Sequence, residues 1–322
     1  MGQVLLTFDT EDFISENSMW FLRSLLLCLK KYDSKALFFV TGHVAERLAG
    51  QTEIAGLLEE HEIGYHSSSH SVHPTIFEFT DIESYKEAYE TALLRETSHI
   101  NPLNGQIEGK GGIFAVRSLW SDKDVKAYRA PGFCWSPPHS EALRDLGLTF
   151  DFSSNIASSP VFYKGLTFYP YPVLREWQGH PSGYRIFLSS ATRKKVTVIC
   201  FHPSYFVNQT NWDSIYYKGN PKHVVCPRPR ANSEFQSMFH RFELFIKRAK
   251  HIQDVGLIKL TTNLAKSREN IVITKDKVEE IYEHSMRWPR MFFGYEPKYL
   301  RNHFLKFFDP SFRTDERKCD LH

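Results

Sequence analysis

The chain has 322 residues, of which 42% are apolar and 24% are charged, so it is too long for a small disulfide module and too hydrophobic to be disordered. Its 40 basic and 37 acidic side chains leave a net charge of +3, which is too small to indicate a nucleic-acid partner. Five cysteines, an odd number without a CxxC spacing, exclude a disulfide scaffold and a cysteine-rich zinc site.

Short β-rich segments alternate with longer helical patterns from the N-terminus to about residue 264. The predicted strands cover residues 4–8, 36–40, 62–65, 126–128, 148–152, 185–188, 196–201 and 257–260. Helices are predicted at residues 20–29, 81–97, 139–146 and 233–251. Such alternation is typical of βα units and a parallel sheet, either open or closed into a barrel.

The N-terminus shows no secretory signal, because residues 4–8 lead directly into the acidic segment at residues 9–12. The longest apolar segment, residues 20–29, contains Arg23 and is too short to span a bilayer. The sequence therefore predicts a cytoplasmic protein without a transmembrane segment.

Three segments depart from the alternation. Residues 100–124 contain two Pro- or Gly-rich turns and are predicted to be an insertion. Residues 209–229 are aromatic and basic, which suits a lid loop over a site, with a mobile surface excursion as the alternative. Residues 266–322 include a helical pattern at 278–286 and are predicted to pack on the main domain, with an oligomer or partner contact as the alternative.

Five predicted strands end in a charged or metal-binding side chain. In chain order these side chains are Asp9, His66, Arg129, Asp151 and His202. Chemistry in barrels and open α/β sheets collects at the C-terminal ends of the strands, and solvation alone does not explain five such ends. The pattern therefore predicts one functional site at one edge of the sheet.

Histidines and carboxylates in this set indicate a metal site. His66 and His70 have the spacing that puts two imidazoles on one face of a helical turn, although a polar loop is the alternative. Asp9, Glu11 and Asp12 supply carboxylates, and Asp12 could instead begin a helix. Two histidines and a carboxylate form a common catalytic zinc site, and a further carboxylate could act as general base.

Arg129 and His202 have two interpretations each. Arg129 precedes a rigid turn, where its guanidinium could keep a catalytic carboxylate ionised or form a structural ion pair. His202 follows an apolar strand, where a histidine is often a satisfied core residue. Its place at the same predicted sheet edge favours a role in the site.

The ordered motifs resemble those of the polysaccharide deacetylase family, the NodB-homology enzymes of carbohydrate esterase family four. The motifs are TFD at residues 7–9, EIGYHSSSH at 62–70, RAP at 129–131, DFSS at 151–154 and FH at 201–202. The resemblance covers about residues 3–264 and implies an α/β fold, a distorted (β/α)7 barrel with a divalent metal, usually zinc, at the strand ends. We therefore expect a deacetylase barrel at residues 1–265 and a C-terminal helical extension at 266–322.

Carried over position by position, the resemblance implies a role for each catalytic residue. Asp9 would be the catalytic base, Arg129 would orient it, and His202 would be the general acid. Asp151 would be the acid that keeps His202 charged. The backbone N–H near Gly132 would face the developing oxyanion.

The metal ligands depart from the usual family pattern. The resemblance implies that His66 and His70 are the histidine ligands of the metal. Family members usually have a second aspartate directly after the base, where this chain has Thr10, which cannot replace a carboxylate. Relatives with a spaced first motif use the acid two residues after the base, which favours Glu11 and leaves Asp12 as the alternative.

The resemblance implies a hydrolase of non-peptide C–N bonds that removes the acetyl group from an acetylated amino sugar and releases acetate. The expected partner is an N-acetylated sugar, linked to a nucleotide, an oligosaccharide or a lipid at a membrane surface, in surface polysaccharide biosynthesis. Alternatives are an allantoinase-like hydrolase of small amides, which can lack a metal, and a non-catalytic sugar-binding barrel. The second alternative is disfavoured by the presence of Asp9, His66, His70, Arg129 and His202.

Overall fold

The computed structural model describes residues 3–70, 82–170, 173–174, 196–209, 212, 227–252, 270–293 and 300–312. The strands are β1 (Gln3–Thr10), β2 (Leu37–Val40), β3 (Glu62–Tyr65), β4 (Ser98–Ile100), β5 (Ile107–Lys110), β6 (Ala127–Tyr128), β7 (Phe150–Asp151), β8 (Val161–Tyr163), β9 (Leu166–Phe168), β10 (Val173–Leu174) and β11 (Val196–Phe201). The helices are α1 (Glu16–Lys31), α2 (Gly42–Leu48), α3 (Thr52–Leu58), α5 (Tyr85–Glu96), α6 (Ile113–Leu119), α7 (Pro137–Asp145), α9 (Pro203–Val207), α11 (Asn232–Ile252), α12 (Lys275–Phe293) and α13 (Leu300–Phe308), with a 3₁₀ turn η2 (Pro131–Phe133).

The main sheet has the strand order β10-β11-β1-β2-β3-β6-β7-β9-β8, and β4 pairs with β5 in a separate antiparallel ribbon. Neighbours in the main sheet are parallel except β8 and β9. The predicted strands at 185–188 and 257–260 lie outside the described residues, as does most of the predicted lid at 209–229. The sequence did not predict β8, β9 or β10.

The main sheet curls, because side chains from strands that are distant in the sheet order pack together on one face. Leu5 of β1 and Val198 of β11 share an interior cluster with Phe39 of β2 and with Phe152, which follows β7. Four strands lie between β11 and β7 in the sheet order, so these side chains can meet only inside a curved sheet. The predicted α/β barrel-type fold is confirmed.

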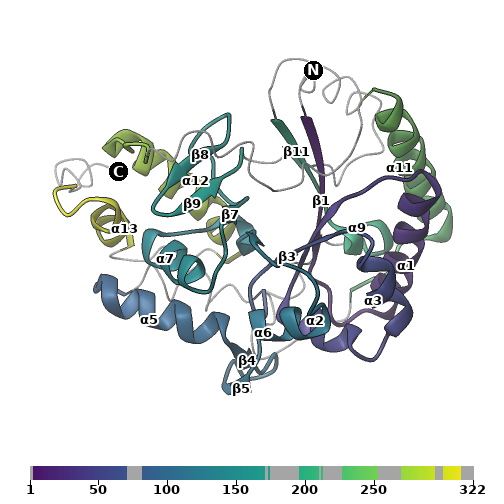
Figure 1. Ribbon diagram of the computed structural model, residues 1–322, viewed down its shortest axis with the longest axis horizontal. Coiled ribbons are helices and arrows are strands. Elements are labelled where there is room, and N and C mark those ends of the chain that lie inside the picture. Colours follow the sequence, from purple (N-terminus) through teal and green to yellow (C-terminus); the bar gives the residue numbers. More distant parts are fainter. Residues whose placement is uncertain are drawn as a thin grey trace.

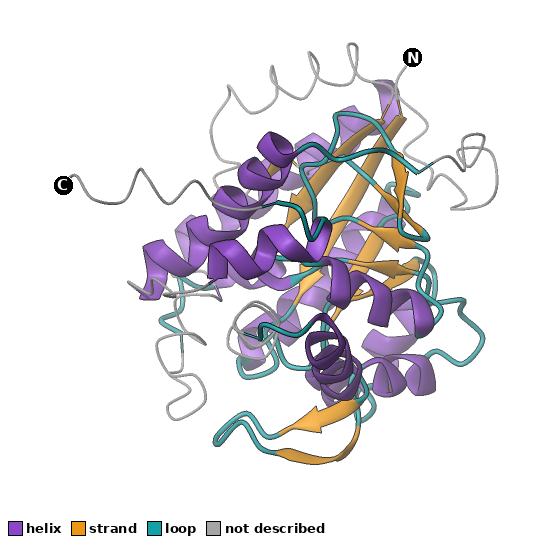
Figure 2. Cartoon of the chain, turned by 90° about the vertical axis from the view of Figure 1, so that its left-hand side faces the viewer, coloured by secondary structure: helices purple, strands orange, loops and turns teal. Residues whose placement is uncertain are grey.

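The outer face of the sheet is covered by helices. Leu22, Leu25, Leu26 and Leu29 of α1 are buried at helical spacing in a cluster with Phe8 of β1 and the facing sides of α2, α3, α6, α9 and α11. Figure 1 shows α1, α3 and α11 together on one side of the sheet, and Figure 2 shows strands enclosed between helices. Strands buried on both faces explain why their sequences are continuously apolar.

The C-terminal helices pack on the other end of the main sheet. Val278 of α12 and Leu305 of α13 are buried in a cluster with Phe168 of β9, Trp135 and Trp212. In Figure 1, α12 and α13 lie beside β8 and β9, opposite α1 and α11. The helix predicted at residues 278–286 is confirmed and extends over α12.

Residues 100–124, predicted as an insertion, contain β5 and α6. Ile113 and Val116 of α6 are fully buried in the same core as α1 and α2. This segment therefore contributes to the core of the barrel. None of the helices described is both long and apolar enough to cross a membrane.

Candidate active site

The strand ends that the sequence singled out meet at one edge of the curved sheet. The register aligns the last residues of β1, β2, β3, β6 and β7, and the last residue of β11, Phe201, pairs with Phe8 of β1. In β1, the interior residue Leu5 precedes Asp9 by four positions, and in β6 the interior residue Ala127 precedes Arg129 by two. Alternate residues of a strand share a face, so Asp9 and Arg129 point to the inside of the barrel.

Glu11, His66 and His70 form a buried group of potential metal ligands. Oε2 of Glu11 lies 3.3 Å from Nε2 of His66 and 2.9 Å from Nε2 of His70. One ligand atom from each side chain lies within 4.8 Å of the other two. Two imidazoles and a carboxylate leave a fourth position open on a four-coordinate ion. These residues therefore fit a divalent metal such as zinc.

The orientation of His66 supports this fit. Nδ1 of His66 lies 2.7 Å from the backbone oxygen of Arg129. A carbonyl oxygen can only accept, so Nδ1 carries a proton and Nε2 faces Glu11. A carbonyl that holds the second nitrogen of a histidine is the usual support of a metal ligand, because it fixes the ring and its tautomer.

Charge explains why Glu11 can act as a ligand despite its burial. Burial alone would raise the pKa of Glu11, but the charges of His70 and His202 and hydrogen bonds from His66 and His70 lower this pKa below its ordinary value. The carboxyl group is therefore ionised at neutral pH, which is the state that binds a metal.

Residues 66–70 form an irregular loop, so the helical turn predicted from the histidine spacing is wrong. Ser67 and His70 have φ values of 65° and 53°, and the N–H of His70 donates to Oγ of Ser67 at 3.0 Å. This left-handed backbone brings the ring centroids of His66 and His70 to 4.9 Å. The two rings converge because of the loop conformation.

Gly42, the first residue of α2, fastens this loop. Its N–H donates to the backbone oxygen of Ser67 at 3.0 Å, and a Cβ at Gly42 would lie 2.8 Å from the oxygen of Ser68 and 2.9 Å from Cα of Gly112.

We expect Gly42→Ala to lower the free energy of unfolding by about 1–3 kcal/mol, because backbone must move to admit the methyl group. In the control Gly56→Ala, where a Cβ meets nothing within 4 Å, helix propensity predicts a gain of up to about 1 kcal/mol. Urea unfolding of both variants checks the ranking, and a stabilised Gly42→Ala would contradict it.

Asp9 is the centre of a second polar group, which lies beside the group of Glu11, His66 and His70. Its Oδ1 accepts a hydrogen bond from Nη1 of Arg129 at 2.6 Å. Its Oδ2 lies 3.5 Å from Nε2 of His202 and accepts from Sγ of Cys200 at 3.3 Å. The same Oδ2 lies 4.0 Å from Nε2 of His66, so Asp9 adjoins the metal-binding group.

Arg129 controls the charge of Asp9. The guanidinium is fully buried and its central carbon lies 4.3 Å from the ring centroid of Phe39. Burial alone would raise the pKa of Asp9, but the positive charges of Arg129, His66 and His202 lower it below its ordinary value. Asp9 is therefore ionised at neutral pH and able to accept a proton.

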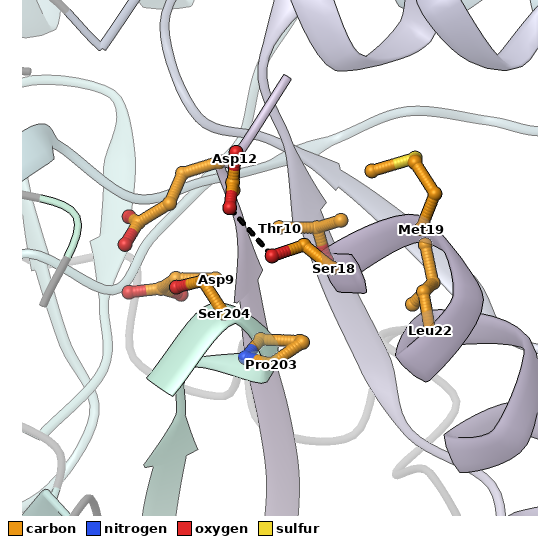
Figure 3. Close-up of a pocket in the computed structure, with 9 residues that line it drawn as sticks. Asp9, Thr10, Asp12, Ser18, Met19, Leu22, Pro203 and Ser204 are labelled. Carbon is orange, nitrogen blue, oxygen red and sulfur yellow. Dashed lines mark hydrogen bonds between the residues drawn. The ribbon is translucent and has the colours of Figure 1, made fainter. Parts of the chain in front are cut away.

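Asp12 has a different role from its neighbours. Its Oδ1 accepts from the N–H groups of Ile14 at 3.0 Å and Ser15 at 2.9 Å, and its Oδ2 accepts from Oγ of Ser18 and from Nδ2 of Asn208. Figure 3 shows the bond from Ser18 to Asp12 in the pocket at the end of β1. Both carboxylate oxygens of Asp12 accept hydrogen bonds at the start of α1. The structure therefore does not place Asp12 with the potential metal ligands Glu11, His66 and His70.

Asp151 does not pair with His202 in the described part of the chain. Its Oδ1 accepts from the N–H of Ser153 at 2.7 Å, and the positive charges that act on it belong to His139 and Arg129. The predicted pairing is not found, because the described partner of the Asp151 carboxylate is the N–H of Ser153 in the segment that directly follows β7. The carboxylate that faces His202 is that of Asp9.

Asp151 gives a pH-dependent prediction. It is fully buried, and burial raises its pKa from 3.8 to about 6. Between these values the folded chain binds the proton more tightly than the unfolded chain, so this group stabilises the fold as the pH falls through 6 and costs stability above it. We expect Asp151→Asn, which keeps an acceptor for Ser153, to gain stability over wild type at about pH 8 and to lose this gain towards about pH 4. Urea unfolding across this range checks it, and a pH-independent difference would contradict it.

Gly132 lies in η2, three residues after Arg129. Its φ of 60° and ψ of 12° are left-handed, and Phe133 follows with φ 59°. The N–H of Ala130 donates to Oγ of Ser153 at 2.7 Å, which fixes the start of the turn. The contact of the Gly132 N–H with an oxyanion stays a prediction.

Cys200 is the site residue that sequence reasoning missed. Its Sγ lies 3.2 Å from Nη1 of Arg129, in addition to its contact with Asp9. Cys200 precedes His202 by two positions at the end of β11, so both side chains face the same side. Strand periodicity, which places Cys200 on the same side as His202, is the signal that could have identified it.

Comparison with known structures finds several carbohydrate esterase family four proteins. The enzyme from Streptomyces lividans, in complex with acetate, has 14% identity over 77% of this chain and 89% of its own, with a TM-score of 0.36. A Streptococcus mutans esterase has 14% identity over 78% and 83%, with a TM-score of 0.39. A pseudoenzyme from Bacillus anthracis has 14% identity over 77% and 61%, with a TM-score of 0.39, so this chain spans less than two thirds of that protein.

Comparison with sequences gives one family match, which covers about the first third of the chain. No curated protein sequence matches the chain. The sequence profile described as polysaccharide deacetylase matches residues 2–111, the segment that holds Asp9, Glu11, His66 and His70. The resemblance predicted from the motifs is thereby confirmed over residues 2–111, which carry the pattern of the polysaccharide deacetylase family.

Proposed function

We propose that this protein is a metal-dependent enzyme that hydrolyses the acetamide of an N-acetylated amino sugar to acetate and a free amine. The family match supports sugar N-deacetylation as the general class. The observation that carries the proposal is that Asp9, held by Arg129, adjoins the buried group of Glu11, His66 and His70.

In this proposal Glu11, His66 and His70 hold the metal, which we take to be zinc. When bound, such an ion supplies Lewis acidity that polarises the acetamide carbonyl and eases deprotonation of water. The mixed nitrogen and oxygen donors suit zinc better than magnesium or calcium, which prefer oxygen ligands alone.

Asp9 would remove the proton of the attacking water. Arg129 occupies Oδ1 of Asp9, which leaves Oδ2 directed towards the metal-binding group. The same ion pair keeps Asp9 ionised before the reaction and fixes its orientation. Cys200 supports this geometry by donating to Oδ2 and accepting from Arg129.

His202 would donate a proton to the departing amine, which is otherwise too basic to leave. Its side chain is 15% exposed whereas that of Asp9 is 2% exposed, so His202 lies closer to the side from which substrate enters. The N–H of Gly132 would stabilise the oxyanion by a hydrogen bond of fixed direction.

The substrate that we propose is linked to a nucleotide, a lipid at a membrane surface or an oligosaccharide, and serves surface polysaccharide biosynthesis. The support is the basic and aromatic composition of residues 209–229, which suits an anionic carrier. Salt weakens the attraction between these basic side chains and an anionic carrier, whereas it has little effect on uncharged contacts with the acetamide.

Acetate release from a panel of acetylated compounds tests the proposal. The panel contains a nucleotide-linked N-acetyl amino sugar, an N-acetylated oligosaccharide and a small cyclic amide. We expect turnover of at least one sugar and its loss on chelation. Hydrolysis of the small amide alone, unchanged by chelator, would replace the proposal with the allantoinase-like alternative.

A further inference from the structure

A second group of potential ligands lies outside the hydrolytic site. It consists of His43 and Glu46 on α2 and His99 on β4. Nδ1 of His43 lies 3.1 Å from Oε2 of Glu46, and Nδ1 of His99 lies 2.9 Å from Oε1 and 3.0 Å from Oε2. One carboxylate is thus held between two imidazoles, each through the same ring nitrogen.

The backbone fixes these three side chains in place. The ring of His43 lies 4.8 Å from that of Phe13 and 5.0 Å from that of His99 between centroids. Gly111 lies against the backbone of His99, since a Cβ at Gly111 would approach the nitrogen of His99 to 2.6 Å. The donor atoms are therefore brought together by α2 and by the β4–β5 ribbon.

The donor spacing requires either a ring hydrogen or a metal ion between each nitrogen and the carboxylate oxygen. A nitrogen lone pair and a carboxylate oxygen about 3 Å apart repel each other unless a proton or a metal ion lies between them. A tetrahedral zinc ion with bonds of about 2.0–2.1 Å separates its ligand atoms by about 3.3 Å, which is close to the separations found here. A single ion can therefore replace two separate protons with little movement.

We propose that His43, Glu46 and His99 bind a second divalent transition-metal ion, with zinc, copper and nickel as the class that suits imidazole and carboxylate ligands. The side chains of Glu46 and His99 are 32% and 29% exposed, so an ion can enter from solvent. The second site shares no ligand with the Glu11, His66 and His70 group.

The position of this ion gives it a structural role. It joins α2 to β4, and the first two N–H groups of α2 donate to the backbone oxygens of Ser67 and Ser68 at 3.0 and 3.1 Å. Those residues lie between the two histidines of the hydrolytic site. Occupation of the second site therefore stabilises the loop that carries His66 and His70, without contact with substrate.

Metal content measured on chelator-treated full-length protein after equilibration with Zn²⁺ and desalting tests the proposal. We expect two ions for each wild-type chain, one for His99→Ala, one for Glu46→Gln and one for His66→Ala. The double variant His66→Ala/His99→Ala is expected to retain none. His240→Ala, which alters an exposed histidine of α11, is the matched control and should retain two.

The variants separate the two sites from each other. A wild-type chain with one ion that persists in both His99→Ala and Glu46→Gln, and disappears in His66→Ala, overturns the second site alone. A single ion that disappears only in His99→Ala and Glu46→Gln supports the second site and contradicts the metal in the proposed function. Circular dichroism confirms that each variant is folded before its metal content is compared.

Discussion

Asp9→Asn is expected to lower kcat/KM for acetate release by about 10²–10⁴-fold, the usual contribution of a general base. Asparagine keeps an oxygen that can accept from Arg129, but it cannot take a proton from water. Acetate release at saturating and limiting substrate measures the effect. Turnover within a few-fold of wild type would show that another group removes the proton.

The same substitution leaves the buried guanidinium of Arg129 without its counter-charge. Removal of one partner of a buried ion pair costs about 3–5 kcal/mol, which is less than the total stability of many domains. We therefore expect Asp9→Asn to be folded at 25 °C with a lowered thermal midpoint. Circular dichroism on the assayed sample distinguishes lost chemistry from lost fold.

Glu11→Gln is expected to weaken metal binding by more than about 100-fold and to reduce turnover to background at low metal concentration. Substitution of a residue that only hydrogen-bonds to a metal ligand already lowers metal affinity or activity by about 10–100-fold. We expect a larger effect at Glu11, because it is proposed as a direct ligand. Titration of apo protein with zinc, followed by acetate release at each step, measures both effects.

Asp12→Asn is the matched control, because it changes the neighbouring acid in the same way. The new amide would face Nδ2 of Asn208 and Oγ of Ser18, where the carboxylate now accepts. We expect a loss of about 1–3 kcal/mol in unfolding free energy with unchanged metal affinity. Metal loss in Asp12→Asn together with retention in Glu11→Gln would reverse the assignment.

The sequence predicts which residues lie at the functional edge of the sheet, because a strand is recognised from the pattern of its own few residues. A buried parallel strand that ends in a polar side chain needs only its own residues to be recognised, as at Asp9 and Arg129. The confirmed helices α1, α7 and α11 likewise follow from apolar spacing within one segment. Such local patterns agree with the structure because the apolar face that they define is the face buried in the core.

The choice between Glu11 and Asp12 could not be made in this way. The two acids are adjacent after β1, and either has the right chemistry for a metal. Asp12 is taken by the N–H groups of Ile14 and Ser15, which depends on how the chain turns into α1. The sequence offers a helix start as one role of Asp12, but spacing alone does not decide between that role and metal binding.

The same limit explains why the sequence did not predict β8 and β9. β8 and β9 are three residues each, too short to show a period, and they join through Lys164 and Gly165, which both have positive φ. Two-residue hairpin turns often have the sequence Asn-Gly or Asp-Gly. This turn has lysine at the first position, so the usual sequence signal of a hairpin is missing. The predicted pairing of Asp151 with His202 failed for a different reason. Strand patterns place both residues at one edge of the sheet, but they do not fix which side chains touch there, and Asp151 accepts from Ser153 instead.

The most direct test measures zinc content and acetate release on one sample of wild-type protein, before chelation, after chelation and after zinc is restored. We expect acetate release from an N-acetylated amino sugar to fall to background when the group of Glu11, His66 and His70 loses its ion and to return when zinc is added. Full acetate release from protein whose zinc content is below one tenth of an ion per chain would contradict it.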